Sequence, residues 1–158
     1  MIQAITETTI YANLSTEDNR INTTLSKQKI YFLVKLINDM DGSVSYCYPT
    51  KEIYNRYTNM RFVYAVTPDM FKNEINLLPA GYWKYEVYEV SWIGEVSILE
   101  LRAPATETDV LPVSDDNGVV QGIVTKGKLN LSEKIGTEQV QYVQRQEPSE
   151  TNYIYYGQ

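Results

Sequence analysis

The stretch "LLPAGYWKYEVYEVSW", residues 77–92, decides the fold class, because its side chains alternate with the two-residue period of a β-strand. The turn residues Pro79, Ala80 and Gly81 fix where this strand begins. The face that we expect to pack inward comprises Trp83, Tyr85 and Val87. The opposite face, a mixed surface suited to protein contact, comprises Tyr82, Lys84, Glu86 and Tyr88.

Other runs of the chain have the same strand character. Residues 27–39, "KQKIYFLVKLIND", are apolar on both faces, which predicts a central strand covered on two sides. The turn at 39–42 joins it to a following strand as a hairpin or near-hairpin. Residues 60–68 predict another strand, which Pro68 ends because proline cannot donate to a strand ladder.

The part of the chain after residue 92 holds two more predicted strands. One is "GEVSILELRAP", residues 94–104, and the acidic stretch 105–118 that follows is expected to be a long loop or an edge excursion. The other is residues 119–132, where the interior glycines Gly122 and Gly127 predict a bulge or a close backbone approach.

Three segments are less regular. Residues 50–59 predict either a short helix capped by Thr50 or a wide connection, and residues 69–78 predict a single helical turn. Residues 136–147 begin as a strand, and the aromatic end of the chain is expected to pair with a sheet edge of its own or of a neighbour.

Short strands with frequent turns and no long amphipathic helix predict an all-β protein, either an antiparallel β-sandwich or a barrel. Of these we expect the sandwich, immunoglobulin-like or jelly-roll-like, with extended N- and C-terminal arms. The predicted division is an arm or edge strand at 1–26, the sandwich at 27–147 and an arm or strand at 148–158.

The composition limits the catalytic and metal-binding mechanisms that this protein can use. The chain has 158 residues, no histidine and one cysteine, Cys47, so histidine-based catalysis, cysteine–histidine pairs and thiolate zinc sites are excluded. Cys47 lies in an alternating run and is expected to be a buried, inert thiol. No cofactor or metal site is predicted, and we expect no enzymatic activity.

Two groups of acidic residues are candidates for a catalytic pair or a calcium site, but we expect both to be ordinary strand and turn residues. Glu86 and Glu89 lie on opposite faces of one strand, so they do not converge as paired carboxylates do in glycosidases. Asp109, Asp115 and Asp116 fit no calcium-loop spacing and are expected to form a solvated turn.

The chain contains 14 tyrosines, which raises the alternative of a stacking surface for sugars. A carbohydrate-binding module would use Tyr82, Tyr88 and Trp92 as exposed rings. A nucleic-acid ligand is not expected, because the net charge is −6 and base-stacking sites also need a basic groove.

The sequence carries no targeting signal that we recognise. The N-terminal residues lack a basic region and a long apolar region, and no segment reaches the roughly 20 apolar residues of a membrane helix. We therefore expect no membrane association, and synthesis and assembly in a cytoplasm.

The order of these segments resembles that of small β-sandwich virion proteins of tailed, crAss-like phages of Bacteroidetes. The residues that carry the resemblance are "KIYFLVKLIND", "YNRYTNMRFVYAV", "INLLPAGYWKYEVYEVS", "GIVTKGKLNLS" and the terminal "YIYYGQ", together covering roughly residues 28–158. The chain departs from that pattern in an acidic insert at 95–118 and in Thr125 and Lys126, where a Glu-rich version is common.

The resemblance implies a non-enzymatic structural subunit of a head–tail connector or tail ring. Such a subunit would bind identical copies and portal, tail or capsid proteins, and would be found in the virion after assembly in the host bacterial cytoplasm. The alternative of the same fold is a capsid decoration or head-fibre anchoring protein. The residues expected to make protein contacts are Ile10, Tyr11, Leu14, Tyr88, Val110, Leu111, Val113, Tyr153, Ile154, Tyr155 and Tyr156.

Overall fold

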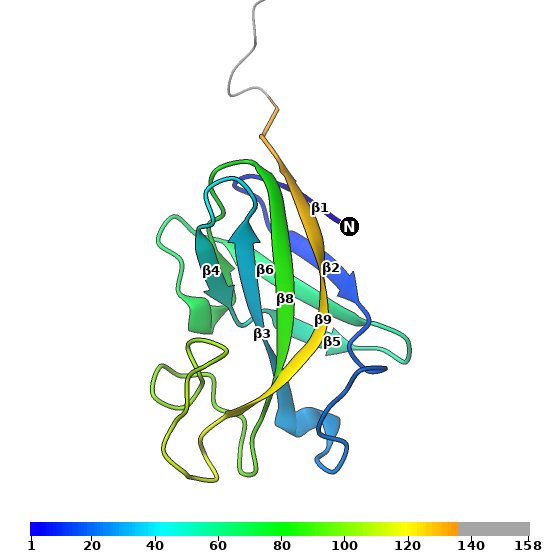
Figure 1. Cartoon of the computed structure of the whole chain (residues 1–158), viewed down its shortest axis with the longest axis vertical. Helices are drawn as coiled ribbons and strands as arrows, with labels where there is room; N and C mark the ends of the chain where they lie inside the picture. Colours follow the sequence, from blue (N-terminus) through cyan, green and yellow to red (C-terminus); the bar gives the residue numbers. More distant parts are fainter. Residues whose placement is uncertain (136–158) are drawn as a thin grey trace, which may run out of the picture.

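Two β-sheets packed face to face make up residues 1–135, which are the residues that this computed structural model describes (Figure 1). Sheet A has the order β1-β9-β8-β3-β4, and sheet B has the order β2-β6-β5 with β7 also paired to β6. The strands of sheet A are β1 (Ile2–Ile5), β3 (Ile30–Asn38), β4 (Val44–Cys47), β8 (Gly81–Ser91) and β9 (Val119–Ser132). The strands of sheet B are β2 (Ile10–Leu14), β5 (Thr50–Ile53), β6 (Thr58–Tyr64) and β7 (Glu74–Ile75). Two short 3₁₀ turns are η1 (Lys27–Lys29) and η2 (Met70–Lys72).

The all-β sandwich predicted from the sequence is confirmed, but the sheets are mixed rather than purely antiparallel. β1 runs parallel to β9, and β7 runs parallel to β6, while the remaining pairs are antiparallel. β1 and β2 lie in different sheets, so β1 has no hairpin partner and lies instead along β9, which comes from the far end of the described chain.

The alternation predicted for residues 81–91 is confirmed in β8. Trp83, Tyr85 and Val87 are buried between the sheets, where Val87 lies opposite Val34 of β3 and Tyr85 lies opposite Leu36. Each fully buried side chain of this size contributes about 1.5–3 kcal/mol relative to exposure. The core between the sheets therefore depends on the inward face of β8.

β3 is covered on both sides, as its two apolar faces predict. Val34 and Leu36 face the core between the sheets. Leu33 faces the other way and is fully buried with Val90 and Trp92 in a second apolar cluster. Sheet A therefore has two apolar layers, one against sheet B and one beneath the segment that joins β8 to β9.

Glycines allow β9 to follow β8 closely, as the sequence predicts. The pairing of β8 with β9 shifts register twice, between Val87 and Tyr88 and between Glu89 and Val90. Gly122, opposite Glu89, has a φ of 148°, which L side chains rarely adopt. At Gly127 an added Cβ would lie 2.5 Å from the hydroxyl oxygen of Tyr85, so a buried ring occupies the space of the missing side chain.

Two predictions about local structure are wrong, and one is confirmed. Residues 50–59 contain β5 and its hairpin turn into β6 instead of a helix or a wide connection. Residues 94–104 form no strand. They cannot pair with β8, because β3 and β9 already occupy both of its edges. Their backbone turns instead, and the N–H groups of Arg102 and Ala103 both donate to the Leu99 carbonyl at 2.9 Å. The single turn expected within residues 69–78 is η2.

The first 26 residues lie within the sandwich instead of forming a separate arm. They contribute β1 and β2, each an outer strand of its sheet. Ile10 and Leu14 are buried in the core between the sheets, so they cannot serve as the exposed contact residues that we expected from the sequence. Tyr11, which alternates with them on β2, is exposed.

A buried carboxylate holds the segment after β2 against sheet A. Glu89 is fully buried, and its two oxygens accept hydrogen bonds from the backbone N–H groups of Ile21 at 2.9 Å and Asn22 at 2.7 Å. Asn19 adds a hydrogen bond from its side chain to the Val124 carbonyl at 3.0 Å. The carboxylate thus satisfies two backbone donors that have no strand partner.

The C-terminal predictions fall on residues 136–158, which lie outside the described residues. They concern the strand expected at 136–147, the arm or strand at 148–158, and the contact residues Tyr153, Ile154, Tyr155 and Tyr156.

We predict that Glu89→Gln lowers the free energy of unfolding by about 1.5–3 kcal/mol. An amide has one accepting oxygen, so one of the two backbone N–H groups would face an NH₂ group inside the protein. Urea denaturation followed by tryptophan fluorescence measures the loss. Glu100→Gln, at an exposed glutamate, is the matched control and should change stability by less than about 0.5 kcal/mol. Equal stability of the two variants would contradict this account of Glu89.

Candidate interaction surface

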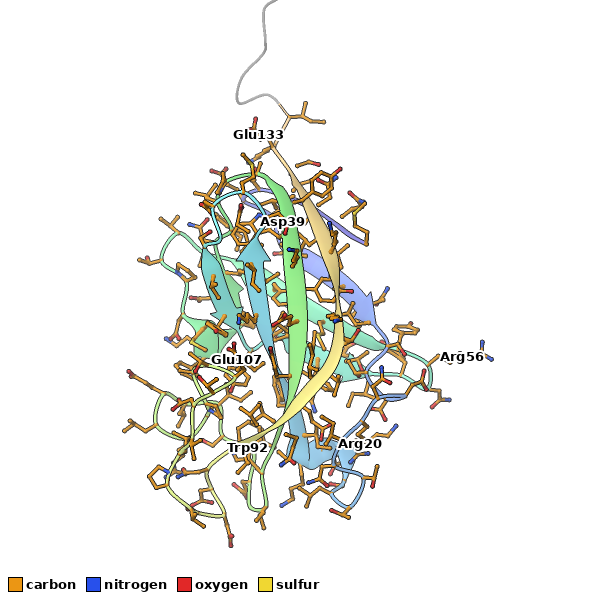
Figure 2. The ribbon with its side chains drawn as sticks, viewed as in Figure 1. Arg20, Asp39, Arg56, Trp92, Glu107 and Glu133 are labelled. Carbon is orange, nitrogen blue, oxygen red and sulfur yellow. The ribbon has the colours of Figure 1, made fainter. Side chains whose placement is uncertain are left out.

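The loop of residues 94–118 joins β8 to β9 and packs on the face of sheet A that points away from sheet B (Figures 1 and 2). Its underside completes the second apolar cluster: Ala103 is fully buried there with Tyr48 and Trp92, and Val96 and Ile98 pack against them. The Tyr48 hydroxyl donates to the Pro104 carbonyl at 2.5 Å inside this layer.

The end of the loop fits closely over Trp92. A Cβ on Gly118 would lie 2.6 Å from Cζ2 of Trp92 and 2.9 Å from a methyl group of Val90, so only glycine lets the backbone pass there. The Gly118 N–H donates to the Arg102 carbonyl at 2.8 Å, which joins the last residue of the loop to its first half.

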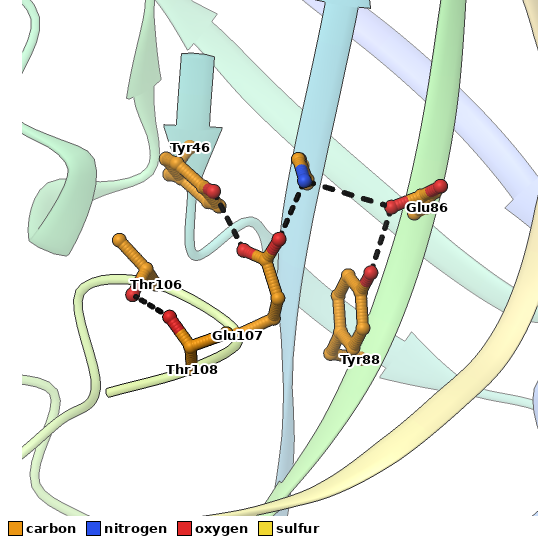
Figure 3. Close-up of polar contacts among 7 residues, drawn as sticks. Tyr46, Glu86, Tyr88, Thr106, Glu107 and Thr108 are labelled. Atoms are coloured by element: carbon orange, nitrogen blue, oxygen red, sulfur yellow. Dashed lines mark hydrogen bonds and ion pairs between the residues drawn. The ribbon is translucent and has the colours of Figure 1, made fainter. Parts of the chain in front are cut away.

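A polar network fixes the middle of the same loop to the sheet (Figure 3). Glu107 accepts one hydrogen bond from the ammonium group of Lys35 on β3 at 2.5 Å and another from the hydroxyl of Tyr46 on β4 at 2.6 Å. Lys35 also lies 4.0 Å from Glu86 on β8, and Glu86 accepts from the Tyr88 hydroxyl at 2.7 Å. One loop residue is thereby connected to three strands of sheet A.

The pKa values of the network follow from its hydrogen bonds. Partial burial raises the pKa of Tyr46 and Tyr88, and the carboxylates that accept hydrogen bonds from their hydroxyls raise it further. Burial also acts to raise the pKa of Glu107, but the hydrogen bonds from Lys35 and Tyr46 outweigh it and hold that pKa below the ordinary value of 4.5. The ionised carboxylate is therefore the form that anchors the loop.

The anchored loop presents apolar side chains to solvent. Val110 is 91% exposed and Val113 is 107% exposed, and Ile93 and Val119 at the neighbouring ends of β8 and β9 are also exposed. We call the set Ile93, Val110, Leu111, Val113 and Val119 the loop-end surface; it lines a groove together with Leu25 and Pro112. A grouped apolar surface of this kind usually marks a binding site rather than ordinary solvent-facing structure.

Acidic side chains accompany the loop-end surface. The loop carries six acidic residues and one basic residue, Arg102, which lies 3.9 Å from Asp116. Asp115 lines the groove itself. A strongly acidic partner would therefore be repelled, whereas an uncharged or basic apolar partner would not.

The structure brings together only part of the predicted contact set. Val110, Leu111 and Val113 lie on one surface, as their shared loop implies. Tyr88 is half-buried in the polar network, and Tyr11 lies on the outer strand β2 of the other sheet.

Sequence reasoning missed Ile93 and Val119. Both are apolar and flank the acidic loop: Ile93 lies two residues after the end of β8, and Val119 is the first residue of β9. Their positions in the sequence carry a signal, because the pairing of β8 with β9 must bring the two ends of that loop together.

The three rings predicted for sugar stacking do not form one exposed surface. Trp92 is fully buried beneath the loop, which corrects its expected role as an exposed ring. The Tyr88 ring is half-buried with its hydroxyl engaged by Glu86, and only Tyr82 is well exposed. One isolated ring makes no stacking platform.

Other chemistry finds little support in the described part of the chain. Residues 1–135 contain no group of three or more His, Cys, Asp or Glu side chains arranged to hold a metal ion. Cys47 is buried as expected, and burial raises the pKa of its thiol to about 12. Within the same residues no helix is long and apolar enough to cross a membrane.

Comparisons of the chain with protein-family models, curated proteins and solved structures found no match. The likeness to phage virion proteins therefore rests on the sequence pattern alone.

We predict that Glu107→Gln lowers the free energy of unfolding by about 1 kcal/mol at neutral pH, and that this difference shrinks in acid. The pKa of Glu107 is lower in the folded chain, so its stabilising effect is complete above the ordinary value of 4.5 and is lost as pH falls through the folded-state pKa. Urea denaturation of both proteins across this range measures the difference. Glu95→Gln, at an exposed residue of the same loop, is the control; a difference independent of pH would contradict the assignment.

Proposed function

We propose that this protein is a non-enzymatic structural subunit of a tailed-phage virion, in a head–tail connector or tail ring. The resemblance in segment order supports the class of protein. The loop-end surface supports assembly, because it combines fully exposed valines with a backbone that is held in place from below.

The single observation that carries the proposal is the exposure of Val110 and Val113 on this anchored loop. Here the apolar cluster around Trp92 and the ion pair of Lys35 with Glu107 fix the loop to sheet A before any partner binds. A preordered apolar surface binds with a smaller entropic cost.

A ring subunit must present two different surfaces, because closed rings use head-to-tail contacts. The loop-end surface is one of them. The decoration or fibre-anchoring alternative uses the same fold with a trimer or a single copy at a capsid site, so the number of copies in the purified assembly separates the two.

We predict that the chain forms an oligomer whose mass is lowered by replacing Val110 and Val113 together with aspartate. Two new charges in an already acidic apolar contact lose the burial of two valines and add repulsion, weakening association by at least about tenfold. Native mass spectrometry at matched concentrations measures the distribution of copies.

Val66→Asp is the matched control, because Val66 is an exposed valine in another loop, between β6 and η2. It should leave the distribution unchanged. A chain that stays monomeric with its other virion partners present would contradict the proposed assembly role, and an oligomer indifferent to the double substitution would place the contact elsewhere.

A further inference from the structure

The groove at the loop-end surface has a partner within the sequence of this protein. We propose that residues 151–158 of one copy, "TNYIYYGQ", bind in the groove of a second copy and link the subunits head to tail. The inference rests on the proposed function in one respect, which is that copies of this chain assemble with each other.

The chemistry of the groove suits this segment. Its walls include the apolar side chains of Leu25, Ile93, Val110, Leu111 and Val119. Glu150 is the last charged side chain in the sequence given, so residues 151–158 bring three tyrosines and an isoleucine, and no acidic side chain, to an acidic surface. The aromatic strand β8, by comparison, carries Lys84, Glu86 and Glu89 among its rings.

The groove also offers an acceptor for a tyrosine hydroxyl. Asp115 is one of the residues that line it, and within residues 1–135 its carboxylate makes no hydrogen bond or ion pair. A buried tyrosine ring with its hydroxyl bound at the rim is the usual arrangement for this side chain at protein contacts.

The position of the groove favours a second copy over the chain's own segment. Val119, the first residue of β9, lines the groove, whereas residue 135 follows the other end of that strand (Figure 1). The 14 residues of β9 cover about 46 Å. From residue 135 to residue 151 there are 16 steps, which span at most about 55 Å when fully extended.

A copy's own segment could therefore reach the groove only if it were almost straight along the whole sandwich. A second copy placed end to end brings residue 135 of one chain close to the groove of the next. That arrangement needs a fraction of the available length. It repeats in one direction, which is the head-to-tail contact that a ring or stack requires.

Chemical cross-linking between full-length chains tests the proposal. One chain carries Val113→Cys and the other carries Tyr155→Cys, each purified separately, mixed and treated with a short bismaleimide. The native Cys47 is fully buried and serves as an unreactive background. We expect a covalent dimer in at least about tenfold higher yield than from the matched mixture of Val66→Cys with Tyr155→Cys.

Two further chains make the outcome decisive. In the double variant Val113→Cys with Tyr155→Cys, we expect ladders of linked chains; a linked monomer instead would overturn the proposal in favour of the chain's own segment.

Deleting residues 149–158 should reduce the native mass to that of the monomer. If the chain lacking residues 149–158 still assembles while the double variant Val110→Asp with Val113→Asp does not, then residues 151–158 do not occupy the groove, and the proposed assembly role stands. If no chain assembles with itself, both fail.

Discussion

The whole structure depends on β8 being paired along both of its edges. β3 and β9 occupy those edges over almost the full length of the strand, so β8 lies at the centre of sheet A. The inward face, with Trp83 and Val87, holds sheet B. At its far end, Val90 and the following Trp92 carry the second apolar layer.

Full pairing of β8 also explains the loop. Because β3 and β9 occupy both edges of β8, residues 94–118 cannot pair with the strand that they follow, and they cover the outer face of sheet A instead. The side chains of this segment then contribute to the layer above Leu33 and Trp92, and Glu107 reaches Lys35 on β3. Val110 and Val113 of the same segment lie on its outer surface, where the loop-end surface forms.

The N-terminal residues fill the space that the smaller sheet leaves open. Sheet B covers only part of sheet A, and the segment after β2 continues over the remainder without forming a strand. Its backbone donors need acceptors, and Glu89, near the end of β8, supplies two of them. A glutamate in this place would be costly without those donors, so the segment and the carboxylate depend on each other. Leu25 of the same segment lines the groove, so the proposed binding surface is built from two segments that lie far apart in the sequence.

Local sequence determined the strand periods, the inward face of β8, the two-sided cover of β3 and the special role of Gly122 and Gly127. These features follow from side-chain alternation and backbone sterics, which act between residues close in sequence. The tertiary structure alone decided that residues 94–104 are a loop, that Trp92 is covered, and that Ile10 and Leu14 pack inward. Each of these depends on which strands are neighbours and what remains to cover a face, and local alternation does not specify such long-range contacts.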